Sequence, residues 1–162
     1  MTGDINQLLR DIAGGRRTML LGIGTPGCGD DAAGTVLASR LKGNGSFRSL
    51  ICEDMPENYT GDVRAWRPET VLLVDAVDSG ARAGETVILE SRHLEERVYS
   101  HRPALRHLME YITAETGART FLLGIQPEST EPGRSLSAPV LETVNQLAEL
   151  MQTSTGESAW EH

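Results

Sequence analysis

The chain has 162 residues, of which 39% are hydrophobic and 4% aromatic, so it is long enough for one aliphatic core and one domain. Its 23 acidic and 15 basic residues give a formal net charge of −8, which opposes binding to nucleic acid. No apolar run approaches the roughly 18 residues of a membrane span, and the N-terminus lacks a secretory signal pattern. Two cysteines, Cys28 and Cys52, make no disulfide framework. We therefore expect a cytoplasmic protein without membrane insertion or a nucleic-acid partner.

Strand-like and helix-like segments alternate along the chain. Apolar or alternating runs predict strands at 18–23, 49–52, 71–74, 85–89 and 120–125, the fourth of them an edge or half-exposed strand. Helical spacing predicts helices at 33–41, 59–66, 103–112 and 139–151. This order predicts an α/β fold, a three-layer α/β/α sandwich around a mostly parallel, twisted, five-stranded sheet. We expect one catalytic domain over 1–152 and a polar, flexible tail over 153–162.

A glycine-rich loop joins the first predicted strand to the first predicted helix. Residues 22–27 read Gly-Ile-Gly-Thr-Pro-Gly and match the GxGxxG pattern of dinucleotide-binding folds. A pyrophosphate needs a bare helix N-terminus, whereas Asp30 and Asp31 place two carboxylates there. A dinucleotide-binding regulatory module is therefore an alternative that the local charge opposes.

Asp30 and Asp31 also suit the first turn of a helix, where each acid stabilises the helix by about 0.3–1 kcal/mol. We expect Asp30 to be the capping residue and Asp31 to point toward the carboxyl edge of the sheet, available to hold a cation. Capping does not explain four glycines between positions 22 and 29. Close approach of the backbone to a partner does.

Asp75 directly follows the apolar run 71–74, so we place it at the carboxyl end of a central strand. A carboxylate there is costly unless it is solvated, capped or paired. A role in a turn is the other explanation for Asp75, and it is the better one for Asp78, which precedes Ser79-Gly80.

His101 precedes the helix predicted to start at Pro103, a position where a histidine is more often a surface or capping residue than a ligand. Sites in parallel α/β sheets form beyond the carboxyl ends of the strands. Two carboxylates and one imidazole there, from Asp31, Asp75 and His101, would make an incomplete coordination shell, as in sites that engage a substrate.

Four segments carry a recurring pattern of motifs: the glycine-rich loop with its acid pair (21–34), the strand ending in Asp75 with its turn (72–85), the histidine segment (100–105) and Phe-Leu-Leu-Gly-Ile-Gln-Pro-Glu (121–128). Their order and spacing resemble the nickel–iron hydrogenase maturation proteases. Met-Pro-Glu-Asn at 55–58 and Gly-Ile-Gln-Pro at 124–127 look most like the branch serving formate-hydrogenlyase-type enzymes.

Two positions and one short segment depart from that family pattern. Thr25 stands where asparagine is usual, Ala32 stands where glycine is usual, and Cys-Glu-Asp at 52–54 replaces an Asp-Gly-Gly-like turn. None of these departures removes a ligand, but they alter the backbone path around the loop and the contacts expected with the substrate.

The resemblance implies an endopeptidase that removes the C-terminal extension of a hydrogenase large-subunit precursor after nickel insertion. It assigns metal ligation and catalysis to Asp31, Asp75 and His101. The nickel is expected to be carried by the substrate, and no organic cofactor is expected.

The chemistry of such a site needs no protein nucleophile. A Lewis-acid ion polarises the scissile carbonyl or lowers the pKa of a bound water, and a carboxylate can act as general base. We expect Gly24, Thr25 and Gln126 to contact the substrate, Gln126 by donating a hydrogen bond to the peptide. Cys28 is interpreted as a small loop residue.

Two further classes of protein share parts of this pattern. A phospho-receiver module needs a lysine after the fifth strand, but the only lysine is Lys42, at the end of the first helix. A generic metallopeptidase with its own bound metal would use the same ligands, so it stays an alternative.

Overall fold

The computed structural model describes residues 2–13, 17–43, 47–94 and 104–160. The strands are β1 (Thr18–Ile23), β2 (Phe47–Glu53), β3 (Thr70–Ala76), β4 (Thr86–Leu89) and β5 (Arg119–Ile125), and the helices are α1 (Thr2–Ala13), α2 (Ala33–Arg40), α3 (Thr60–Trp66), α4 (Leu105–Thr116) and α5 (Ala138–Trp160). Short 3₁₀ turns occur at Gly29–Ala32, Pro56–Tyr59 and Ser91–His93. All five predicted strands and all four predicted helices are found, with boundaries moved by a few residues.

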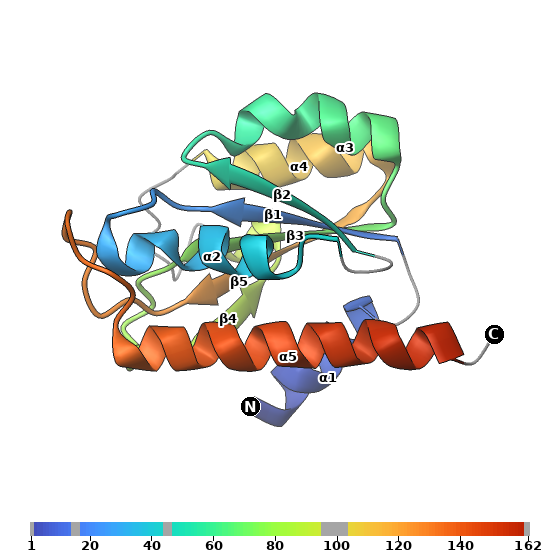
Figure 1. The fold of residues 1–162 in the computed structure, drawn as a ribbon. Helices are drawn as coiled ribbons and strands as arrows, with labels where there is room; N and C mark the ends of the chain where they lie inside the picture. Colours follow the sequence, from blue (N-terminus) through green and yellow to red (C-terminus); the bar gives the residue numbers. More distant parts are fainter. Residues whose placement is uncertain (1, 14–16, 44–46, 95–103, 161–162) are drawn as a thin grey trace.

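The five strands form one sheet in the order β2-β1-β3-β5-β4. The β1–β2, β1–β3 and β3–β5 pairs are parallel, and only the edge strand β4 pairs antiparallel, with β5. Helices α1, α2 and α5 cover one face of the sheet, and α3 and α4 cover the other (Figure 1). The predicted three-layer α/β/α sandwich with a mostly parallel sheet is therefore confirmed.

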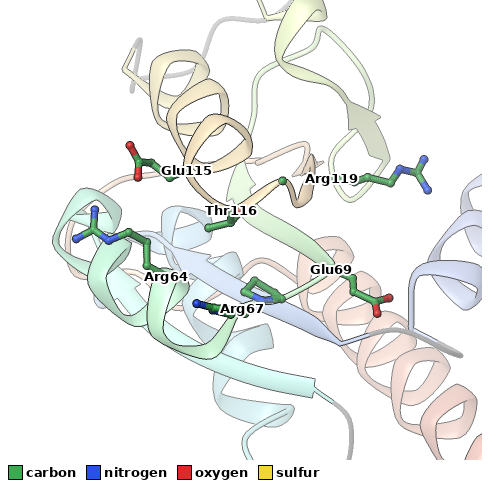
Figure 2. Close-up of a pocket in the computed structure, with 8 residues that line it drawn as sticks. Arg64, Arg67, Glu69, Glu115, Thr116 and Arg119 are labelled. Carbon is green, nitrogen blue, oxygen red and sulfur yellow. The ribbon is translucent and has the colours of Figure 1, made fainter.

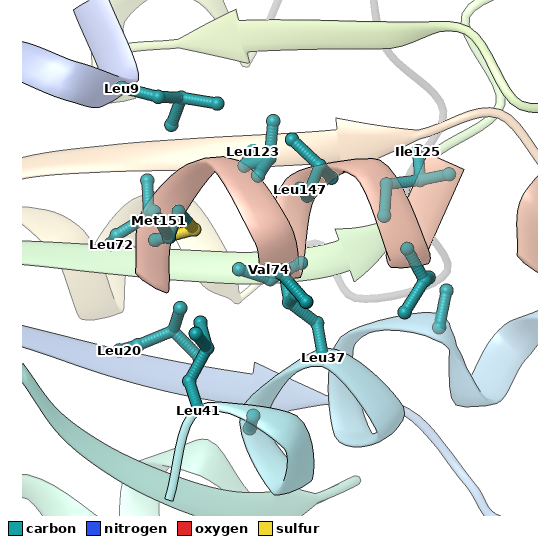
Figure 3. Packing of buried hydrophobic residues seen from close by; sticks show 14 of the residues in the cluster. Leu9, Leu20, Leu37, Leu41, Leu72, Val74, Leu123, Ile125, Leu147 and Met151 are labelled. Atoms are coloured by element: carbon teal, nitrogen blue, oxygen red, sulfur yellow. The ribbon is translucent and has the colours of Figure 1, made fainter. Parts of the chain in front are cut away.

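Alternating side chains of the central strands supply two separate cores, because successive residues of a strand point to opposite faces. Leu20, Leu72 and Leu123 pack with α1, α2 and α5 (Figure 3). Leu21 and Leu73 pack with α3 and α4 on the other face. Every residue of β3 is buried, as expected for a central parallel strand.

Helix α1 is an element that the sequence interpretation did not include. Ile5, Leu8, Leu9 and Ile12 recur at helical spacing, and Leu9 and Ile12 are buried in the core beneath α5. The pattern was therefore present in the sequence. At the other end, α5 continues to Trp160 and so runs through most of the segment expected to be a tail.

Glycines allow α2 to pack directly on the carboxyl ends of β1 and β3. A Cβ atom on Gly34 would lie 2.0 Å from the carbonyl oxygen of Val74 and 2.5 Å from that of Ile23. A Cβ on Gly22 would lie 2.4 Å from the Cβ of Ala38. Within the glycine-rich loop, a Cβ on Gly24 would lie 1.7 Å from the carbonyl oxygen of Asp31, so the close approach seen there is to the protein's own backbone. Among the described residues, no helix is long and apolar enough to cross a membrane.

Candidate active site

The sheet has a topological switch point between β1 and β3. The chain leaves β1 through α2 to reach β2 on one side, then returns through α3 on the opposite face to β3 on the other side. In doubly wound sheets a crevice opens at the carboxyl ends of two such strands, and ligands bind there. Here this position carries the loop 24–31 after β1 and the residue Asp75 at the end of β3.

Asp75 is fully buried, with 0% of its surface exposed. It lies one residue beyond the Gly22–Val74 pair of the β1–β3 ladder and pairs with Gly124 of β5 on its other side. The backbone N–H of Ala76 donates to Asp75 Oδ1 at 2.9 Å. A carboxylate at this depth is tolerated only with polar or cationic partners.

Asp31 comes from the 3₁₀ turn at Gly29–Ala32 and is half-buried. The backbone N–H of Thr25 donates to Asp31 Oδ2 at 2.8 Å, which ties the carboxylate to the glycine-rich loop. The structure therefore places Asp31 in the segment that follows β1, and Asp75 near the end of the neighbouring strand β3. His101, the third predicted residue, lies outside the described residues.

The capping role predicted for Asp30 is wrong. Cys28 and Ala32 occupy the N-cap positions of the 3₁₀ turn and of α2, and neither helix start has a side-chain cap. The carboxylate of Asp30 instead accepts hydrogen bonds from Ser137, at the start of α5, and from Glu128. The reason is a long-range contact across about a hundred residues of sequence, to which no local pattern points.

Gln126 directly follows β5 and is buried, with 8% of its surface exposed. Its Oε1 accepts hydrogen bonds from the N–H groups of Ser79 (2.8 Å) and Ala81 (3.3 Å), and its Nε2 donates to Asp78 Oδ1 at 3.2 Å. The amide thus holds the loop that follows Asp75. Substrate contact by Gln126 stays a prediction, and in this structure its polar atoms bond within the protein.

The backbone of Gly24 and Thr25 is also engaged internally. Gly24 is buried; its N–H donates to the carbonyl of Glu53 at 2.7 Å, and its carbonyl accepts from Thr35 Oγ1 at 2.7 Å. The role of Thr35 in fixing this loop was not anticipated. Asp78 accepts from the Gly80 N–H at 3.1 Å, which confirms its assignment to a turn. The substrate contacts of Gly24 and Thr25 stay predictions.

The backbone N–H groups of this loop are not available to bind a phosphate group. The N–H groups of Gly24, Thr25, Cys28, Gly29, Asp30 and Asp31 all donate to acceptors of the protein itself. A dinucleotide loop instead directs such groups at the pyrophosphate. The hydrogen bonding and the acid pair both disfavour a nucleotide site.

Cys52 is unsuited to act as a nucleophile. Cys52 is buried beneath α3, and burial, with the nearby carboxylates of Asp62 and Glu57, raises the pKa of its thiol to about 12. It therefore holds almost no thiolate near neutral pH.

Within the described part of the chain, no group of three or more His, Cys, Asp or Glu side chains is placed to hold a metal ion.

A depression of about 790 Å³ opens at the opposite, amino-terminal edge of the sheet (Figure 2). Arg64, Arg67, Arg119, Glu69 and Glu115 lie along it. In Figure 2 the side chains of Arg64 and Arg119 point away from each other, with Glu115 on the side of Arg64 and Glu69 on the side of Arg119. The guanidinium groups do not converge on one point, so we do not assign the site here.

Together these features define a small doubly wound α/β protein whose switch point presents carboxylates instead of a phosphate cradle. The model of the hydrogenase maturation protease family matches residues 54–154. The hydrogenase 3 maturation protease of Escherichia coli K12 is 30% identical over 130 residues, which cover 78% of this chain and 83% of that protein. The chain therefore belongs to the hydrogenase maturation protease family.

Solved structures agree with this assignment. The [NiFe] hydrogenase maturation protease HycI from Thermococcus kodakarensis KOD1 superposes with a TM-score of 0.84 at 36% identity, covering 92% of this chain and 99% of that one. A crystal structure of the hydrogenase 3 maturation protease gives a TM-score of 0.73 at 28% identity, covering 82% and 86%. The predicted family and its peptidase class are confirmed, and the dinucleotide-binding and generic metallopeptidase alternatives find no support.

Proposed function

We propose that this protein is the endopeptidase that removes the C-terminal extension of a nickel–iron hydrogenase large-subunit precursor after nickel insertion. The observation that carries the proposal is the position of Asp75, a fully buried carboxylate near the end of β3. Strand β3 pairs with β1, and the segment that follows β1 holds Asp31. The relatives from Escherichia coli and Thermococcus kodakarensis are named as hydrogenase maturation proteases, which supports a role in processing a hydrogenase.

Asp31 and Asp75 place two carboxylates at the switch point, and neighbouring carboxylates attract a divalent cation. Carboxylate and imidazole ligands suit first-row divalent metals, and three of them leave coordination positions open. In the proposal, Asp31, Asp75 and His101 contact the nickel that the precursor carries. The protein would thereby detect that its substrate has been loaded with metal.

Peptide hydrolysis at this site uses a water molecule as the nucleophile. A carboxylate accepts the proton of that water as it attacks the scissile carbonyl, and the leaving amine then takes up a proton. Asp31 is the better candidate for this base, since it is half-buried whereas Asp75 is enclosed by the sheet. We infer a reducing compartment, the cytoplasm, as the place of action, consistent with the free cysteines Cys28 and Cys52.

A cleavage assay with two forms of the precursor tests this function. The purified protein is mixed with nickel-loaded or nickel-free large-subunit precursor, and the product mass is measured. We expect cleavage of the loaded form alone. Equal cleavage of both forms would show that nickel is not recognised, and cleavage of neither would show that the proposed function is wrong.

Substitution of the two acids tests the site. Asp31→Asn and Asp75→Asn keep the side-chain shape and remove the charge, so we expect each to lower the cleavage rate at least about 100-fold. Asp62→Asn, in an exposed position of α3, is the matched control and should cleave at the wild-type rate. Thermal unfolding shows whether each variant is folded, and folded Asp31→Asn and Asp75→Asn proteins with full activity would exclude this site.

A further inference from the structure

Asp30 is adjacent to Asp31 in sequence, yet its carboxylate is bonded away from the switch point. It is 1% exposed and accepts four hydrogen bonds. Oδ2 accepts from the Glu128 N–H (2.8 Å), the Ser129 N–H (3.3 Å) and Ser137 Oγ (2.8 Å), and Oδ1 accepts from the Ser137 N–H (2.7 Å). All four donors belong to the β5–α5 loop (residues 126–137).

The backbone extends this contact on both sides of Asp30. The Asp30 N–H donates to the carbonyl of Ser129 at 2.8 Å, and the Gly29 N–H donates to that of Arg134 at 2.9 Å. Gly29 has a φ of +58°, and a Cβ there would lie 2.5 Å from the Ser129 carbonyl oxygen. The 3₁₀ turn and the β5–α5 loop are therefore docked backbone against backbone, and the buried carboxylate lies at the centre of the junction.

The same 3₁₀ turn carries Asp31. A 3₁₀ helix has three residues per turn, so neighbouring side chains leave it in different directions. Asp30 faces the β5–α5 loop, whereas Asp31 accepts the N–H of Thr25 in the glycine-rich loop. Hydrogen bonds to an ionised carboxylate are about twice as strong as neutral ones, and so they hold the turn firmly.

We propose that Asp30 is a positioning residue, which fixes the carboxylate of Asp31 in the active site by anchoring their shared turn to the β5–α5 loop. This role rests on the proposed function only in that Asp31 belongs to the active site. In this proposal the two adjacent acids have different roles: Asp30 stabilises the local fold, and Asp31 contacts the substrate.

Amide hydrogen exchange tests the proposal without any substrate. Asp30→Asn turns an NH₂ group toward N–H and O–H donors, so the turn should loosen and the Thr25 N–H should lose its fixed acceptor. We expect Thr25 to exchange about tenfold faster than in the wild type, while Leu72 in the core of β3 is unchanged. Ser137→Ala, which removes only the Oγ bond, should have the same effect by a smaller factor, and it provides a second variant if Asp30→Asn does not fold.

Ser49→Ala is the matched control for simple loss of stability. Ser49 is buried, and its Oγ donates to the carbonyl of Ala38 at 2.6 Å, in a part of the fold away from the β5–α5 loop. This variant should leave Thr25 exchange unchanged. Unchanged Thr25 exchange in both Asp30→Asn and Ser137→Ala would overturn the proposal, as would equal acceleration in Ser49→Ala.

Cleavage of the nickel-loaded precursor provides the second readout. With all proteins folded at the assay temperature, kcat/KM should fall about tenfold or more in Asp30→Asn, less in Ser137→Ala and not at all in Ser49→Ala. A wild-type kcat/KM in folded Asp30→Asn would overturn the positioning role. If the wild type itself does not cleave the precursor, the proposed function fails, while the exchange experiment still decides the role of Asp30.

Discussion

Gln126 and Ser79 are joined by two hydrogen bonds: Gln126 Oε1 accepts from the backbone N–H of Ser79 at 2.8 Å and from its Oγ at 3.2 Å. The two residues are 47 positions apart in the sequence, and their hydrogen bonds hold the loop that follows the end of β3 at Ala76. The buried amide of Gln126 thus fixes the backbone of a loop that has no regular hydrogen bonding of its own.

Gln126→Glu should destabilise the protein, because a carboxylate cannot donate to Asp78 and would repel it. We expect the free energy of unfolding to fall by about 1–3 kcal/mol at neutral pH. Urea unfolding at neutral pH measures this loss.

Gln146→Glu is the matched control for Gln126→Glu. Gln146 is exposed on α5, where its Nε2 contacts Glu142 at 3.4 Å. This change should alter the unfolding free energy by less than about 0.5 kcal/mol. Equal effects of the two substitutions would show that the hydrogen bonds of Gln126 add no stability to the loop.

Gly34→Ala should be among the most damaging small substitutions in this chain. The new Cβ would meet backbone oxygens of Val74 and Ile23, which cannot move without breaking the β1–β3 ladder. We expect a loss of about 3 kcal/mol or more in unfolding free energy. Circular dichroism during thermal unfolding measures it.

The control for Gly34→Ala is Gly61→Ala in α3. Nothing lies within 4 Å of a Cβ at Gly61, and alanine favours the helix. This change should raise the unfolding free energy by up to about 1 kcal/mol. A Gly34→Ala protein as stable as the wild type would contradict the packing of α2 on the strand ends.

Much of this architecture was predictable because it depends on local patterns. The apolar runs around Leu21 and Leu73 predicted buried parallel strands, and parallel strands place their carboxyl ends together. The position of the candidate site was inferred from that geometry. The spacing of Leu8, Leu9 and Ile12 is also a local signal, typical of an amphipathic helix.

The hydrogen bonds of the Asp30 carboxylate were not predictable by this route. An aspartate before an apolar helix has the same local pattern whether it caps that helix or bonds elsewhere. Its partner Ser137 is 107 residues away and reaches it only once β5 and α5 are in place. Gln126 is similar, because its bonds to Ser79 depend on the tertiary fold.

The titration of Cys52 should make stability depend on pH in the alkaline range. Its pKa rises from 9.0 to about 12 on folding, so the folded state disfavours the thiolate. The stabilisation is complete below pH 9 and is lost as the pH rises from 9 toward 12. The stability difference between wild type and Cys52→Ala should therefore shrink above pH 9, by at most about 1.4 kcal/mol per pH unit.

Alkylation of the folded protein gives an independent measurement on the thiols. Iodoacetamide should label the half-buried Cys28 at pH 8 and leave the buried Cys52 unlabelled, as mass spectrometry of the peptides would show. Urea should expose both. Labelling of the two cysteines at equal rates in the folded protein would contradict the burial of Cys52.

Glu53 ends β2 with a φ of +53°, in the left-handed region that favours glycine. It lies at the irregularity of the β1–β2 ladder, where Gly22 pairs with Ile51 and Ile23 pairs with Glu53. Its carbonyl accepts the Gly24 N–H, so the glycine-rich loop fixes this strained conformation from outside. The same segment departs from the Asp-Gly-Gly-like turn that is common in the family.

Glu53→Gly should therefore stabilise the protein. Relief of the left-handed strain is worth about 1–2 kcal/mol, and the greater freedom of glycine in the unfolded chain offsets about 0.5–1 kcal/mol of it. We expect a net gain of about 0.5–1 kcal/mol in urea unfolding, and a similar gain for Arg67→Gly, whose φ is also +53°. Arg48→Gly, at an exposed and regular position of β2, should lose about 1 kcal/mol. A loss of that size in Glu53→Gly would mean that the Glu53 side chain stabilises the turn by more than its backbone strain costs.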